Sequence, residues 1–166
     1  MQWGPLDSLI AEESSVCHLI GQSALEVHDS HVEKTGYAKG MFKDAKIMAF
    51  VAILDEKKAT DFYSGVLGLR KISGDQFALE FDAGGVTLRA AFVKEVATAP
   101  YTVLGWQVTG IESVVQELTG KGVIFERYGF IPQDDLGIWN AGTAKVAWFK
   151  DPFGNLLSVS EHGIQD

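Results

Sequence analysis

The sequence predicts an α+β domain in which two βαβββ modules form a curled mixed sheet, as cup-shaped half-barrels with the helices outside. Three observations lead to this prediction. The chain has 166 residues, 46% hydrophobic and 22% charged, which suits one domain with a sizeable core. A pattern of strand, helix and three strands begins near residue 48 and again near residue 103, 55 residues later. Repetition of such a pattern indicates an internal duplication.

The first module is expected to begin with a buried strand and an amphipathic helix. Residues 47–54 form a continuous apolar run bounded by Asp55, whose carboxylate suits the N-cap of a following helix. Gly68 is expected to end that helix. The helix has the i, i+3, i+4, i+7, i+8 apolar spacing, at Ala59, Phe62, Tyr63, Val66 and Leu67. Further strands are expected at 69–73, 77–81 and 86–93, with a hairpin turn at 82–85.

The second module repeats this order after a linker at 97–101. A strand is expected at 103–108, followed by a second amphipathic helix that ends at Gly120. The apolar stripe of this helix consists of Ile111, Val114, Val115 and Leu118. The remaining strands are expected at 123–127, 137–139, 144–149 and 156–160.

The chain is expected to divide into an extension and a domain. Residues 1–45 are predicted to be an N-terminal extension, with a short helix at 5–13. Residues 46–166 are predicted to form the two-module domain, with modules at about 46–96 and 102–162.

Composition narrows the possible functions. The 14 Lys and Arg against 22 Asp and Glu give a formal charge of −8, which argues against nucleic acid and anionic membrane surfaces as partners. The one cysteine, Cys17, leaves no intramolecular disulfide or cysteine-built zinc site. No signal-peptide pattern and no apolar run near the ~20 residues of a membrane helix is found. We therefore expect a cytoplasmic protein.

Three motifs stand at the ends of predicted elements: FY-x-x-VLG-L at 62–69, FDAGG at 81–85 and KDPFGN at 150–155. Through them, residues 46–162 resemble the vicinal-oxygen-chelate superfamily, which includes glyoxalase I, bleomycin-resistance proteins and extradiol dioxygenases. The resemblance implies the two-module fold. It also implies a homodimer, because single-chain two-module members commonly pair.

In metal-dependent members of this superfamily, four inward side chains hold a divalent ion, typically His or Gln, then Glu or His, His and Glu. The resemblance places these positions at Met48, Arg89, Val103 and Ser158. None of the four is a usual ligand for such an ion, and Arg89 would add a positive charge. We therefore expect no metal and no cofactor, which argues against glyoxalase I and ring-cleaving dioxygenase activity.

Alternation along the strands predicts which side chains line the cup. Arg89 either clamps an anionic ligand group or pairs with a carboxylate such as Glu80 or Glu161.

The aromatic residues of the connection 127–139 either overhang the cavity or seal the edge of the barrel. Trp106 and Trp148 are expected in the core or at an interface. The candidate ligand-binding residues are Met48, Phe50, Thr87, Arg89, Val103, Gln107, Tyr128, Trp139 and Ser158.

The leading hypothesis is a metal-independent protein that binds a small organic molecule in its cup, as bleomycin-resistance proteins do. One alternative is a lyase or isomerase of glyoxalase type with metal ligands from elsewhere, for example His28, His31 or His162. The spacing of His28 and His31, with Glu33, could hold a metal on a helix, although Asp29-Ser30 between them is typical of a turn. The other alternative is a non-catalytic interaction domain.

Overall fold

The computed structural model describes residues 42–43 and 45–163, which belong to one compact unit, Gly40–Asp166. None of the helices in this described part has the length and apolar character that crossing a bilayer requires. The helix expected at 5–13 lies outside the described residues, as do Cys17, His28, His31 and Glu33.

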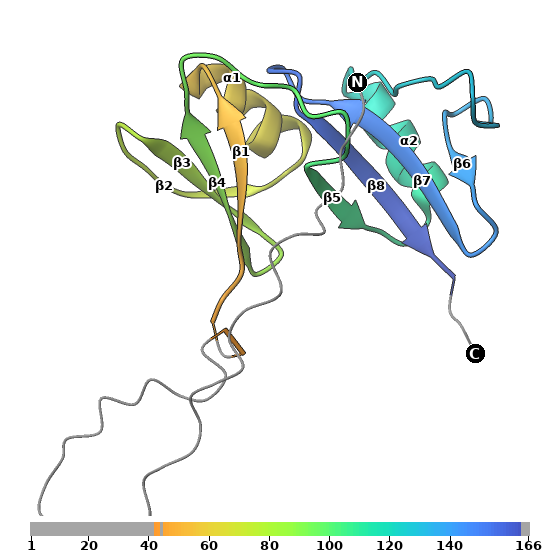
Figure 1. Ribbon diagram of the computed structural model, residues 1–166, viewed down its shortest axis with the longest axis horizontal. Helices are drawn as coiled ribbons and strands as arrows, with labels where there is room; N and C mark the ends of the chain where they lie inside the picture. Colours follow the sequence, from red (N-terminus) through yellow and green to blue (C-terminus); the bar gives the residue numbers. More distant parts are fainter. Residues whose placement is uncertain (1–41, 44, 164–166) are drawn as a thin grey trace, which may run out of the picture. The chain divides into compact units, whose positions relative to one another are not determined.

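The first module consists of a four-stranded sheet and one helical segment (Figure 1). Its strands are β1 (Met48–Ile53), β2 (Arg70–Gly74), β3 (Ala78–Ala83) and β4 (Val86–Phe92). They are ordered β1-β4-β3-β2, with β1 and β4 parallel and the other neighbours antiparallel. All four predicted strands are confirmed, and their ends agree within two residues.

The helical segment between β1 and β2 changes its hydrogen-bonding pattern half-way. The Asp55 carboxylate caps α1 (Glu56–Thr60) by accepting the Lys58 backbone N–H at 2.7 Å, as predicted. The chain then continues as a π-helical segment, η1 (Asp61–Val66). Gly68 ends the segment with φ +74°, a left-handed conformation that suits glycine. The apolar spacing predicted one helix here and did not reveal its π-helical half.

The second module repeats the arrangement. Its elements are β5 (Leu104–Gln107), α2 (Ile111–Gly120), β6 (Trp139–Asn140), β7 (Ala144–Lys150) and β8 (Leu156–His162). The strand order is β5-β8-β7-β6, again with a parallel pair, β5 and β8, beside antiparallel neighbours (Figure 1). The prediction of an α+β fold with two βαβββ modules is confirmed, and neither sheet closes into a barrel.

The strand predicted at 123–127 is wrong. It is reduced to a single antiparallel bridge between Phe125 and Phe149. Beyond it, the Gln133 side chain takes the backbone hydrogen bonds that a strand would make: it accepts the Tyr128 N–H and donates to the Glu126 carbonyl. An amide side chain from the same loop therefore replaces the strand neighbour.

Each sheet buries one face and leaves the other without a helix. The buried faces share one core cluster with the helical segments, for example through the Tyr63 and Phe81 rings, whose centroids are 5.4 Å apart. Burying each such large side chain contributes about 1.5–3 kcal/mol. We call the opposite side the open face. In the first sheet it carries Met48, Phe50, Ala52, Glu80, Thr87, Arg89 and Ala91. In the second sheet it carries Gly105, Gln107, Trp139, Val146, Trp148, Ser158 and Ser160.

A buried hydrogen-bonded node joins the two modules. Asp151, only 5% exposed, accepts the Tyr63 hydroxyl at 2.7 Å and the Asn155 amide at 2.7 Å. Its carboxylate also accepts the backbone N–H groups of Phe153 and Asn155. The Asn155 amide further donates to the Ala52 carbonyl of β1 at 2.8 Å. The sequence motifs at 62–69 and 150–155 thus meet in space.

Candidate functional site

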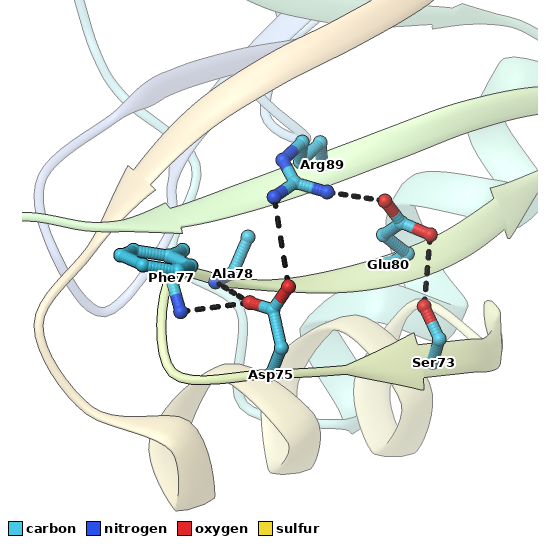
Figure 2. Close-up of polar contacts among 6 residues, drawn as sticks. All are labelled: Ser73, Asp75, Phe77, Ala78, Glu80 and Arg89. Carbon is cyan, nitrogen blue, oxygen red and sulfur yellow. Dashed lines mark hydrogen bonds and ion pairs between the residues drawn. The ribbon is translucent and has the colours of Figure 1, made fainter.

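Arg89 lies in the middle of the first open face, between Phe50 on β1 and Glu80 on β3. Its Nη1 donates to Glu80 Oε1 at 2.5 Å, and its Nη2 lies 3.9 Å from Asp75 Oδ2 (Figure 2). The other Glu80 oxygen accepts the Ser73 hydroxyl at 2.8 Å. Of the two carboxylates named as possible partners of Arg89, Glu80 and Glu161, Glu80 is the one that pairs with it.

Asp75 holds the β2–β3 hairpin beside this pair. Its carboxylate accepts the backbone N–H groups of Phe77 at 2.7 Å and Ala78 at 2.9 Å (Figure 2). These two hydrogen bonds, with a smaller effect from Arg89, lower the pKa of Asp75. The carboxylate is therefore charged near neutral pH. Two carboxylates then face one guanidinium, which leaves this group a net charge of −1.

The rest of the first open face is an apolar edge. Met48 and Phe50 on β1 are 46% and 59% exposed. Thr87, which lies opposite Met48 on β4, is partly buried. The first open face thus combines exposed apolar side chains with a guanidinium that already has a partner.

Ser158 takes the corresponding central place on the second open face. It lies on β8 between Gly105 of β5 and Trp148 of β7. A Cβ atom at position 105 would lie 2.7 Å from the Ser158 hydroxyl oxygen, so any other residue there would require this hydroxyl to move. Among the described residues, nothing hydrogen-bonds the Ser158 hydroxyl. Gln107, one place along β5, is exposed beside Ser160.

Four aromatic side chains gather on the same face: Tyr128, Phe130, Trp139 and Trp148. We call them the aromatic platform. The two indole rings are 6.1 Å apart at 25°, and the Tyr128 ring meets Trp148 edge-on at 5.6 Å and 81°. Phe130 lies 5.5 Å from Tyr128 and is 83% exposed. Trp148 shares the orientation of Ser158 across the strands, so of the core or interface position expected for it the core is wrong, and the interface stays a prediction. Trp106 does pack against the core.

Hydrogen bonds fix the loop that carries part of this platform. The Gln133 amide accepts the Tyr128 N–H at 2.7 Å and donates to the Gly137 carbonyl at 2.7 Å. The Arg127 guanidinium donates to the backbone carbonyls of Asp134 and Asp135. Within the sheet, Trp148 Nε1 donates to the Thr102 hydroxyl at 3.1 Å. No local sequence pattern marks Gln133 or Thr102 as partners of the platform.

The charge near the platform depends on the Tyr128 phenol and on the charged side chains of Glu126 and Lys150 beside it. Partial burial, together with the negative charge of Glu126, raises the pKa of Tyr128. Glu126 itself pairs with Lys150, with 3.0 Å between the carboxylate and ammonium groups. The phenol is therefore neutral at physiological pH.

The four positions that the resemblance links to a metal carry side chains that do not suit one. Met48 and Arg89 lie on the first open face and Ser158 on the second, whereas Val103 packs against the core. Their thioether, guanidinium, hydroxyl and alkyl groups do not fit the oxygen and imidazole ligands that a divalent ion prefers. No group of three or more His, Cys, Asp or Glu residues suited to a metal exists among residues 42–43 and 45–163.

His162 lies at the end of β8, next to Ser160 and Gln107 of the second open face. It hydrogen-bonds Ser160 at 3.2 Å and lines a groove of about 510 Å³ at this end of the second sheet. Glu161 turns away from Arg89 and accepts the Gly110 backbone N–H at 2.5 Å. The structure thus gives neither His162 nor Glu161 a place beside the candidate residues of the first open face.

The comparisons with known proteins agree with this architecture. Solved structures with the same fold include the glyoxalase family protein from Enterococcus faecalis, at 22% identity and a TM-score of 0.56, with 73% of this chain and 99% of that chain covered. The fosfomycin resistance protein FosX from Listeria monocytogenes matches at 12% identity and a TM-score of 0.59, covering 74% and 94% of the two chains. The glyoxalase/bleomycin resistance protein/dioxygenase from Alicyclobacillus acidocaldarius matches at 17% and 0.54, covering 72% and 92%.

Identities this low show the fold alone. A search of curated protein sequences finds no match. The sequence model of one family, described as "Glyoxalase superfamily protein", matches residues 30–164. That match spans most of the chain and includes both modules, so this chain belongs to the glyoxalase superfamily, the vicinal-oxygen-chelate proteins that its motifs resemble.

Proposed function

We propose that this protein binds a small organic molecule on the open faces of its sheets without a metal ion, in the manner of a bleomycin-resistance-like protein. The observation that carries the proposal is the Arg89–Glu80 ion pair, at a position where metal-dependent relatives place a ligand. A guanidinium has no lone pair with which to ligate a cation, and both carboxylate oxygens of Glu80 are engaged, one by Arg89 and the other by Ser73.

The composition of the open faces supports a small-molecule ligand. Apolar and aromatic side chains dominate, with a few polar groups among them, such as Thr87, Gln107 and Ser158. Ligand sites commonly combine such a lining with a few polar groups that orient the ligand. The excess negative charge around Arg89 disfavours an anionic ligand group on the first open face.

We also propose that two copies of the chain pair. The exposed Met48 and Phe50 side chains would gain from being covered by a second copy, and the superfamily resemblance implies a dimer. Sedimentation velocity of the full chain should show a dimer, and a monomer at all concentrations contradicts this proposal. Nucleic acid and anionic membranes are not proposed as partners, because the formal charge is −8.

Metal content tests the proposal first. The full untagged chain is incubated with Zn²⁺, Ni²⁺, Fe²⁺ and Mn²⁺, dialysed and measured by mass spectrometry. We expect far less than one equivalent of any metal. One tightly bound equivalent overturns metal independence.

A screen of small organic molecules, done in the presence of a chelator, tests the binding itself. A ligand at 100 times its Kd raises the stability by about 2.7 kcal/mol, which a thermal-shift measurement detects. Ser158→Val should weaken the binding of a hit at least tenfold, because it fills the centre of the second open face. Ser113→Val, an exposed position on α2, is the matched control and should leave the affinity within twofold.

A further inference from the structure

We infer that the aromatic platform is the binding site and that it takes a planar aromatic molecule carrying no anionic group. This inference rests on the proposed function. It adds to it the place where the ligand binds and the chemical class of that ligand.

The geometry of the platform suits a flat ligand. The Trp139 and Trp148 rings are nearly parallel, at 25°, and the Tyr128 ring stands almost perpendicular to Trp148, at 81°. Aromatic pairs favour offset stacking and edge-to-face contact at centroid distances of about 4.5–7 Å. A planar molecule can make both kinds of contact here at once.

The platform is held in place before any ligand arrives. Thr102 fixes the Trp148 indole, and Gln133 fixes Tyr128 through its backbone. Ordering a flexible side chain on binding costs about 0.5–1.5 kcal/mol, and this cost is reduced where the side chain is already fixed. The connection between α2 and β6, residues 121–138, contains no helix or strand, and connections of this length commonly serve a function.

Polar groups beside the platform can contact the edge of the ligand. Gly105 has no side chain, so β5 places nothing next to Ser158 and Trp148 at this row of the sheet. The Ser158 hydroxyl has no partner in the described part of the chain. Gln107 offers an exposed amide one row along. These groups fit a heteroaromatic edge that donates or accepts hydrogen bonds.

The charges around the platform disfavour an anionic ligand. Its two neighbouring cations are engaged: Lys150 by Glu126 at 3.0 Å, and Arg127 by two backbone carbonyls. Asp134 and Asp135 are exposed in the same loop. Three carboxylates and two cations leave a local charge of −1. A positive ligand would gain from cation–π contact with the indoles, by about 0.5–2 kcal/mol.

Three matched probes test the ligand class: quinoline, N-methylquinolinium and quinoline-2-carboxylate, each titrated into the full chain by calorimetry and ligand-observed NMR. We expect the neutral and cationic probes to bind and the carboxylate to bind at least tenfold more weakly. Trp148→Ala and Trp139→Ala should each weaken binding of the first two probes at least tenfold. Trp106→Phe, on the core side of β5, is the matched control and should change affinity less than twofold.

Each contrary result has a distinct meaning. Unchanged probe affinity in Trp139→Ala and in a folded Trp148→Ala, checked by near-ultraviolet circular dichroism, overturns the platform as the site but leaves small-molecule binding standing. If Trp148→Ala does not fold, Tyr128→Ala takes its place. Tightest binding of the carboxylate, or no binding of any probe, overturns the ligand class. Only the additional failure of every compound in the broad screen overturns the proposed function as well.

Discussion

The two modules share one arrangement of strands and differ at equivalent positions of their open faces. β1, β4 and β3 of the first sheet correspond to β5, β8 and β7 of the second in order and direction. The equivalent rows across them are Phe50, Arg89 and Glu80 in the first sheet, and Gly105, Ser158 and Trp148 in the second. The fold depends on the buried faces, so the open faces are free to differ.

The first row holds a charged group that is already paired, whereas the second row holds a polar group without a described partner. In the first row, Arg89 already satisfies its charge through Glu80, and the large Phe50 side chain stands beside it. In the second row, an exposed glycine and the Ser158 hydroxyl, on a residue 8% exposed and without a described partner, lie beside the half-buried Trp148 indole. Of the two rows, the second is therefore the better place for a ligand.

The largest loss of stability is expected at the buried hydrogen-bonded node around Asp151, which joins the two modules and so supports both rows. Asp151→Ala leaves the Tyr63 hydroxyl and the Asn155 amide buried with a lost partner. We expect the free energy of unfolding to fall by about 3 kcal/mol, because a buried carboxylate with several donors is removed. Urea unfolding measures this loss. Asp135→Ala, an exposed matched control, should stay within about 0.5 kcal/mol of the parent.

Tyr63→Phe removes one hydrogen bond of the same node and should cost about 1 kcal/mol. A loss below 1 kcal/mol for Asp151→Ala would mean that the modules are joined by their shared apolar core and not by this node.

A smaller loss of stability is expected from a change at Gly105, and it can be compared with a change at the equivalent position of the first row. Gly105→Ala places a Cβ atom 2.7 Å from the Ser158 hydroxyl oxygen, so the serine must move. We expect a loss of about 1–2 kcal/mol in urea unfolding. In the Ser158→Gly background the same change should cost at least 1 kcal/mol less, since the clash is gone. Phe50→Ala, the equivalent edge position of the first row, should change stability by less than about 0.5 kcal/mol, because Phe50 is 59% exposed. Equal costs of Gly105→Ala in both backgrounds would contradict the close approach.

Much of the fold follows from local patterns. The apolar run at 47–54, the cap at Asp55 and the stop at Gly68 all lie where the spacing places them. The exceptions leave no mark on the apolar pattern. The π-helical half of the first helical segment keeps the same apolar spacing, and the lost strand at 123–127 depends on the Gln133 side chain.

The candidate site is less predictable. Strand alternation places Arg89 and Ser158 on the open faces, because successive side chains point to opposite sides. It does not say that Arg89 pairs with Glu80, which depends on the register of β3 against β4. Nor does it reveal Trp148 as part of a platform, because the ring partner Tyr128 comes from an irregular loop.

The smallest effect concerns the acid dependence of the first row. Backbone hydrogen bonds from Phe77 and Ala78 lower the pKa of Asp75 from its ordinary value of 3.8. A lowered pKa in the folded state contributes stability that is present above pH 3.8 and is lost as the pH falls through the folded-state pKa. Urea unfolding should therefore show a smaller loss of stability between pH 5 and pH 3 in Asp75→Asn than in the parent. An identical loss in both proteins would mean that these hydrogen bonds do not favour the charged form.

The same variant separates the two rows functionally. Asp75 lies 3.9 Å from the Arg89 guanidinium, whereas Glu80 is hydrogen-bonded to it at 2.5 Å, so Arg89 keeps its partner when Asp75 loses its charge. The affinity for N-methylquinolinium should then stay within twofold of the parent at neutral pH. A larger change would mean that the charge of the first row reaches the ligand, and that the two open faces act on one molecule together.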